Sequence, residues 1–242
     1  MAALFPTCLG DLVAPDMVEH AQIALVRCGV DVQPVRGATC CGQPAFNAGF
    51  HAQARRVARV TLRALAQTTG PIIVPAGSCA AMMSRRWGEL FAGDRDAPLA
   101  HAVAARVVEF TSVLAQHLDA LERHELRWSG TVGYHDSCHM LRELRLSAEP
   151  RAVLRSVRDL ELVPLASSDR CCGFGGTFSV RYPEVSVAMA DSTLDDARAA
   201  GVDALVSADP GRLMQLGGRA DRTHNGPRVL HVATLLHEAG LR

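Results

Sequence analysis

A cysteine pattern that occurs twice constrains the fold of this chain more than any other feature. The run Cys40-Cys41-Gly42 returns 131 positions later as Cys171-Cys172-Gly173, and the single Cys8 returns 130 positions later as Cys138. Adjacent cysteine pairs are uncommon, so two pairs that each have a further cysteine at a matching distance indicate an internal repeat. We therefore expect the 242 residues to form two copies of one unit.

Apolar strands are expected at matching positions in the two copies. Residues 3–8 and 131–138 each form a short apolar run that ends at its cysteine. A second buried strand is expected at residues 71–74, shortly before Cys79, and its counterpart at residues 204–207. A cysteine thus ends the first predicted strand of each copy, and Cys79 follows the strand at residues 71–74.

Helical patterns lie between and after these strands. Proline stands near the first turn, and glycine follows the last turn, of several of them. The predicted helices cover residues 15–27, 47–67, 103–121, 150–157 and 183–200, and each unit is expected to close with a helix, at residues 107–114 and 229–236.

Short apolar strands that alternate with helices are typical of parallel sheets built from βαβ units. The sequence thus predicts an α/β protein of two pseudo-repeated domains, each with a parallel β-sheet flanked by helices. A polar stretch at residues 122–129 follows the long predicted helix and suits a linker. We therefore place the two domains at residues 1–122 and 130–242.

Composition excludes several classes of function and places the cysteines in a reducing environment. The formal net charge is zero, so a nucleic acid is not expected as a partner. Only 5% of residues are aromatic, so a surface that stacks on bases is not expected either. The chain begins without the basic and apolar regions of a secretion signal, and no apolar run approaches the ~18 residues of a membrane span. We expect a cytoplasmic protein, whose eight cysteines serve metal binding or redox chemistry rather than disulfides.

Four cysteines of the first copy, Cys8, Cys40, Cys41 and Cys79, are expected to meet at one edge of a sheet. Each unit begins with the predicted order strand, helix, strand, Cys-Cys-Gly loop, so each of these cysteines follows a predicted strand or its loop. Parallel α/β sheets place their ligands beyond the carboxyl ends of the strands. Gly42 supplies the backbone freedom that lets two adjacent cysteines face one target. Four thiolates suit a [4Fe–4S] cluster. Zinc is the alternative, although zinc modules generally use Cys-x-x-Cys pairs, which this chain lacks.

The segments around these cysteines resemble those of the cysteine-rich CCG domain proteins. That group includes the cysteine-rich subunit of heterodisulfide reductase, the iron–sulfur subunit of glycolate oxidase and the lactate utilisation A proteins, to which these segments are most similar. The likeness covers nearly the whole chain. It is carried by residues 7–11 (TCLGD), 40–45 (CCGQPA), 75–79 (PAGSC) and 171–180 (CCGFGGTFSV).

The resemblance implies an iron–sulfur electron-transfer subunit of a complex that oxidises L-lactate or another 2-hydroxy acid. Its partners would be a ferredoxin-like iron–sulfur subunit and a third lactate-utilisation subunit. Two alternatives stay open: a thiol–disulfide reductase subunit of the heterodisulfide reductase type, and a zinc-stabilised scaffold without enzymatic activity. No flavin or nicotinamide fingerprint occurs in the chain, so a hydride-accepting cofactor would belong to a partner.

The sequence departs from the family pattern at two positions. Ala76 stands where the heterodisulfide reductase proteins have the first cysteine of a Cys-x-x-Cys pair, and Arg212 stands where the family has a cysteine in the second copy. The second site would then keep only three thiolates and either hold a cluster with one open iron or have lost its cluster. Its candidate ligands, which complete the predicted set of seven, are Cys138, Cys171 and Cys172.

Two histidines are further candidate ligands, whereas one cysteine is not. His135 and His139 flank Cys138, where either could replace the missing ligand or instead hydrogen-bond to thiolates from outside the cluster. Cys28 stands at the end of a predicted helix without a cysteine counterpart in the second copy, and it is expected to be a core residue.

Overall fold

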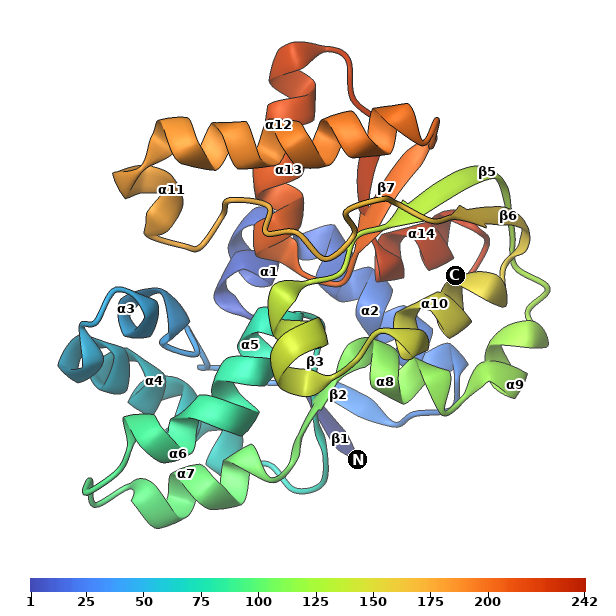
Figure 1. Cartoon of the computed structure of the whole chain (residues 1–242). Helices are drawn as coiled ribbons and strands as arrows, with labels where there is room; N and C mark the ends of the chain where they lie inside the picture. Colours follow the sequence, from blue (N-terminus) through green and yellow to red (C-terminus); the bar gives the residue numbers. More distant parts are fainter.

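The computed structural model describes all 242 residues and contains two four-stranded sheets, both entirely parallel (Figure 1). The strand orders are β2-β1-β3-β4 and β6-β5-β7-β8, so the second sheet repeats the topology of the first. The predicted fold class, an α/β repeat with parallel sheets, is confirmed. The strands are β1 (Ala2–Leu4), β2 (Val32–Pro34), β3 (Ile72–Val74), β4 (Val107–Glu109), β5 (Arg127–Tyr134), β6 (Arg158–Val163), β7 (Ala204–Ser207) and β8 (Arg228–His231).

Helices connect the strands of each sheet. The first half contains α1 (Cys8–Val13), α2 (Pro15–Arg27), α3 (Gln43–Asn47), α4 (His51–Ala66), α5 (Gly77–Ala81), the π-helical turn η1 (Met82–Arg86), α6 (Trp87–Leu90), α7 (Ala97–Ala104), α8 (Phe110–Ala115) and α9 (Leu118–Glu122). The second half contains η2 (Met140–Leu144), α10 (Ala148–Arg155), α11 (Phe178–Arg181), α12 (Pro183–Ala199), α13 (Pro210–Thr223) and α14 (Val232–Glu238). None of the helices has the length and apolar composition needed to cross a membrane.

Most predicted helices are present, and their ends follow local chemistry. Helix α2 begins at Pro15, where a missing N–H costs nothing, and the chain leaves it through Gly29 at φ 82°. Helix α12 likewise begins at Pro183 and is followed by Gly201 at φ 66°.

The long helix predicted at residues 103–121 is wrong. Strand β4 interrupts it, and the closing helices predicted at residues 107–114 and 229–236 each start with residues of an edge strand, β4 and β8. Residues of β4 pair in parallel with β3, so Ile73 lies opposite Val108. A strand of three residues is too short to show a period of two, and only its neighbour in the sheet makes it a strand.

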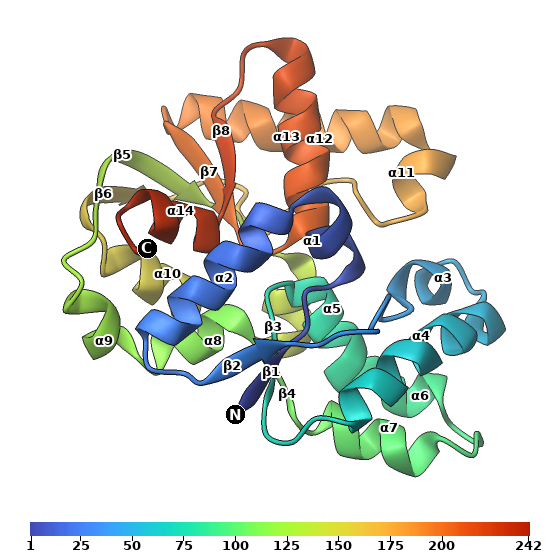
Figure 2. The ribbon, with the colours of Figure 1, turned by 180° about the vertical axis from the view of Figure 1, so that it is seen from behind.

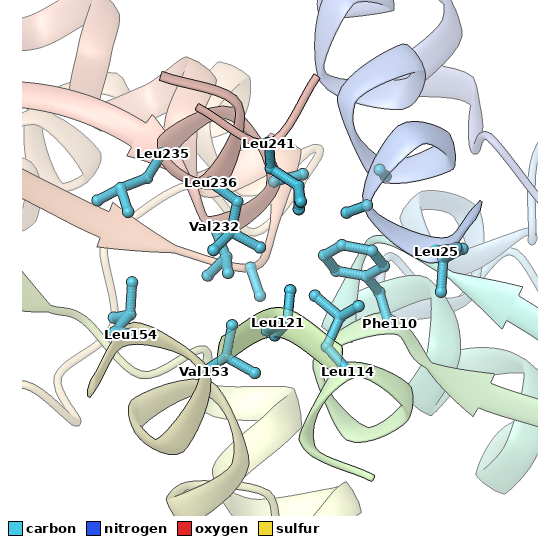
Figure 3. Close-up of a cluster of buried hydrophobic side chains, with 14 of the residues drawn as sticks. Leu25, Phe110, Leu114, Leu121, Val153, Leu154, Val232, Leu235, Leu236 and Leu241 are labelled. Carbon is cyan, nitrogen blue, oxygen red and sulfur yellow. The ribbon is translucent and has the colours of Figure 1, made fainter. Parts of the chain in front are cut away.

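Four helices make the most extensive contacts between the halves. Helix α2 of the first half packs on α14 of the second, and α8 packs on α10 (Figures 1 and 2). Their apolar faces form one core of 30 buried residues that draws from both sheets. Figure 3 shows Phe110, Leu114 and Leu121 of the first half facing Val232 and Leu236 of the second. The halves are therefore held together by a hydrophobic core, with approximate two-fold symmetry.

Each sheet also packs its other face within its own half. In the first half Trp87 and Phe91 are fully buried with α4 and α7, and a smaller core in the second half includes Ala190 and Leu194 of α12. Cys28 is 5% exposed and belongs to the shared core, as predicted for a structural residue.

Glu109 is a buried carboxylic acid at the end of β4. It caps α8, because one of its oxygens, Oε2, accepts hydrogen bonds from the backbone N–H groups of Thr111 at 2.7 Å and Ser112 at 3.1 Å. Its other oxygen, Oε1, has no partner. Burial raises the pKa of Glu109 to about 7, so this side chain takes up a proton on folding over part of the neutral range.

Phe110→Ala should destabilise both halves together. Deleting a buried phenylalanine side chain costs about 3–5 kcal/mol, and the cavity would open in the core that the halves share. We expect a loss of this size in urea unfolding followed by circular dichroism, in a single transition. Val180→Ala, at a side chain 80% exposed, is the control and should change the free energy of unfolding by less than about 0.5 kcal/mol. Two separate transitions for the wild-type chain would contradict a shared core.

Glu109→Gln should remove a pH dependence of stability. The pKa of Glu109 rises from about 4.5 in the unfolded chain to about 7 in the folded one. The contribution of this side chain to the free energy of unfolding is therefore fully present below about pH 4.5 and is lost as pH rises to about 7. The loss is about 3 kcal/mol by linkage. We expect the free energy of unfolding of the wild type to fall relative to that of Glu109→Gln as pH rises from 5 to 8. Urea unfolding of both proteins across this range is the measurement. An equal change at exposed Glu125→Gln would refute the assignment.

Candidate metal centre

The seven predicted ligand cysteines line one cavity of about 180 Å³ between the two halves. The cavity lies beyond the carboxyl ends of both sheets, where the loops after β1, β2 and β3 meet the equivalent loops after β5, β6 and β7. The structure thus brings residues from both ends of the chain into one site. Its cysteine lining comprises Cys8, Cys40, Cys41, Cys79, Cys138, Cys171 and Cys172.

Cys40 and Cys41 of the first cysteine set lie in an irregular turn. The Sγ atoms of Cys41 and Cys79 lie 3.3 Å apart, and the backbone N–H of Gly42 donates to Cys40 Sγ at 3.4 Å. Gly42 has φ 91°, and a Cβ there would lie 2.8 Å from the carbonyl oxygen of Ala54. A residue with a side chain would therefore force the turn open, which explains why glycine follows the cysteine pair.

Two side chains hydrogen-bond to the backbone of this turn. The indole N–H of Trp87 donates to the carbonyl oxygen of Cys41 at 3.0 Å, and the hydroxyl of Thr61 donates to that of Cys40 at 2.9 Å. Trp87 is fully buried and Thr61 is as well. These contacts, which sequence reasoning missed, fix both adjacent thiols on the cavity side of the turn.

Hydrogen bonds between neighbouring thiols lower the pKa of one cysteine in each set. Hydrogen bonds with Cys41 and then Cys8 lower the pKa of Cys40 to about 3, while the hydrogen bond with Cys40 raises the pKa of Cys41 well above its usual value. In the second set, hydrogen bonds with Cys138 and Cys172 lower the pKa of Cys171 to about 2. Each set therefore favours one thiolate, the form in which cysteine binds metals.

The second cysteine set repeats this local geometry. Gly173 has φ 84°, and a Cβ on it would lie 2.4 Å from the carbonyl oxygen of Ser186. The hydroxyl of Ser186 donates to the carbonyl oxygen of Gly173 at 2.8 Å. Cys172 is buried, whereas Cys171 is the one exposed cysteine of the chain.

Arg212 takes the position in α13 that Cys79 takes in α5. It lines the cavity and is 3% exposed. Its NH1 group contacts the ring nitrogens of His135, and its Nε has no partner. Burial and the charge of Arg212 lower the pKa of His135 to about 3, so the imidazole is neutral.

The two histidines considered as ligands have different surroundings. His139 lines the cavity, and its Nδ1 lies 3.5 Å from Cys138 Sγ. His135 is fully buried against Arg212 and is not part of the cavity wall. Only His139 is placed to act on a group held by the cysteines.

Backbone contacts join the two halves at the cavity. The Asp209 carboxylate accepts from the N–H of Ser78 at 2.7 Å, and the Gly77 N–H donates to the carbonyl oxygen of Ala208 at 3.1 Å. A Cβ at Gly77 would lie 2.2 Å from the Cγ of Met140 in the other half. Sequence reasoning missed these contacts of Asp209 and Gly77, since only the packing of the halves brings the two loops together.

The chemistry of the donor set is compatible with a metal or iron–sulfur centre. No three Cys, His, Asp or Glu side chains are arranged as ligands to one metal ion. The thiols instead surround a cavity, and a cluster presents several metal ions to thiolates on separate segments. Four thiols of the first half and three of the second supply soft sulfur ligands, which suit iron–sulfur ligation.

The fold and this cysteine-lined cavity agree with a family match that covers both halves. The model of the cysteine-rich CCG domain matches residues 2–84 and 132–217. The chain therefore belongs to the cysteine-rich CCG domain family, and the resemblance noted from the sequence is confirmed.

Relatives over the full length carry a common name. The chain is 39% identical to lactate utilization protein A of an Exiguobacterium species over 98% of the chain and 96% of that protein. It is 38% identical to the protein of the same name from Shouchella clausii, over 97% of the chain and 98% of that protein. The Geobacillus kaustophilus protein of that name is 39% identical, with the same two coverages.

A solved structure shares the fold alone. It is a hypothetical protein from Helicobacter pylori, which is 10% identical and has a TM-score of 0.64. The alignment covers 98% of this chain and 48% of that one.

Proposed function

We propose that this chain is a cytoplasmic iron–sulfur electron-transfer subunit of a complex that oxidises L-lactate or a closely related 2-hydroxy acid. The single observation that carries the proposal is the convergence of seven cysteines from two repeats on one cavity. The lactate assignment is supported by the name of relatives that match almost the full chain. An oxidoreductase role follows from the chemistry of the site, since a bound [4Fe–4S] cluster accepts and passes on single electrons.

The proposed ligands fall into two groups of unequal completeness. Cys8, Cys40, Cys41 and Cys79 would hold a [4Fe–4S] cluster through four thiolates, which is the full protein ligand set of a cubane. The other group would either hold a cluster with one open iron or hold no cluster. It consists of Cys138, Cys171 and Cys172. His139 would hydrogen-bond to Cys138 from beside the cluster.

Partners complete the proposed reaction. Lactate oxidation removes two electrons, and this chain has no flavin or nicotinamide fingerprint to receive them as hydride. We propose a ferredoxin-like iron–sulfur subunit and a third lactate-utilisation subunit as partners. Residues 1–122 and 130–242 remain our proposed domains, each with one cysteine set.

One observation favours a second candidate, a thiol–disulfide reductase subunit. Cys171 is exposed, hydrogen bonds with Cys138 and Cys172 lower its pKa, and thiolates are the nucleophiles of disulfide exchange. A zinc-stabilised scaffold is the non-enzymatic alternative. Metal content separates the zinc scaffold from an iron–sulfur protein, whereas a reductase would show a cluster signal that changes when a disulfide is added.

Anaerobically purified wild-type chain should contain iron and acid-labile sulfide in equal amounts, about four of each for one cluster or about eight for two. Cys41→Ala should lose the iron of the first site, because its thiolate belongs to the complete ligand set. Cys28→Ala is the matched control, since this cysteine is also buried but lies in the core, and it should keep its iron. One zinc per chain without iron would refute the electron-transfer role and leave the scaffold.

Deletion of the coding gene should abolish growth on L-lactate while growth on glucose persists. Wild type and Cys28→Ala should restore growth, and Cys41→Ala should not, because electron transfer would need the first cluster. Growth rates on both carbon sources are the measurement. Full rescue by Cys41→Ala, at normal protein level in an immunoblot, would remove that residue from the proposed redox centre.

A further inference from the structure

The guanidinium of Arg212 is a buried charge without a carboxylate partner. The residue is 3% exposed, His135 is its hydrogen-bond partner and its Nε is unpaired. No Asp or Glu oxygen lies within 4.0 Å, whereas half-buried Arg151 has Asp136 at 2.7 Å. A buried charge is costly unless an anion or hydrogen bonds compensate it.

Asp136 and Asp209 adjoin His135 and α13 in sequence, but their carboxylates bind other groups. Both oxygens of Asp136 accept from Arg151 at 2.7 Å. Asp209, the residue directly ahead of α13, accepts from the N–H groups of Ser78 and Gly211. His135 cannot supply the missing charge, because an imidazole is either neutral or positive. The chain therefore provides no carboxylate for this arginine.

The thiols of the second set are the remaining anionic groups near Arg212. Once they ligate iron, the metal offsets much of their charge, and sulfur is a weak hydrogen-bond acceptor. The free N–H groups of a guanidinium are arranged to receive two oxygens of one carboxylate. Arg212 also lies in the first turn of α13, a helix of 14 residues whose N-terminal partial charge favours an anion.

We propose that Arg212 binds the carboxylate of a small hydroxy or oxo acid inside the cavity between the two cysteine sets. The identity of that acid rests on the proposed function. Arg212 replaces the thiol that Cys79 supplies in the first half, so the ligand would lie on the side of the second site that has no fourth cysteine. Arg212 and Cys138 line the same cavity, so a carboxylate bound to Arg212 would lie beside the second cysteine set.

Calorimetric titration of the anaerobic full-length chain tests this inference, with L-lactate, pyruvate and lactamide as probes. Lactamide lacks the carboxylate charge and should not bind. Arg212→Gln should weaken the binding of both acids at least about tenfold, as expected for the loss of charged hydrogen bonds. Arg212→Lys should keep part of the affinity, because it keeps the charge without the fork of N–H groups.

The control is Arg219→Gln, on the same helix but paired with Asp191 outside the cavity, which should bind both acids like the wild type. Iron content and the urea midpoint are measured for every variant, so that loss of cluster or fold is not mistaken for loss of binding. Unchanged affinity of folded Arg212→Gln, or no binding by iron-loaded wild type, overturns the inference and leaves the proposed function standing. Arg212-dependent binding by a chain without iron supports the inference although the proposed function fails.

Discussion

The apolar contact of α2 with α14 and of α8 with α10 is the interaction on which the rest of the structure depends. It buries the inner faces of both halves in one core and sets their relative orientation. Because of that orientation, the carboxyl ends of two separate parallel sheets meet at one place. Neither half alone would surround the cavity, whose wall includes Cys41 and Cys79 on one side and Cys138 and Cys172 on the other.

Electrostatics then distinguish two halves that share a topology. In the first half, thiols take all four positions around the cavity and two buried side chains, Trp87 and Thr61, hold the turn that carries two of them. In the second half a buried guanidinium takes the fourth position. Repetition of the backbone with a change of one side chain, from Cys79 to Arg212, turns a complete thiolate set into one with a cation beside it.

Sequence reasoning succeeded where the information is local or repeated. The repeat, the parallel α/β class and helices such as α2 and α12 follow from spacing, apolar patterns and terminal Pro and Gly residues. It failed at β4, because a strand of three residues has no readable period and exists only through its pairing with β3. The contact of Asp209 with Ser78 was equally invisible, since it joins residues 131 positions apart.

The amino-acid order by itself determined which residues carry the chemistry: six repeated cysteines and Cys79, the glycine after each Cys-Cys pair, and Arg212 at the position that matches Cys79. Tertiary structure alone decided that the two cysteine sets share one cavity and that Arg212 lies buried there without a carboxylate. The physical reason is that local patterns encode elements, whereas the orientation of two halves comes from the complementary fit of apolar surfaces distant in sequence. Burial, charge pairing and cavity shape all follow from that fit.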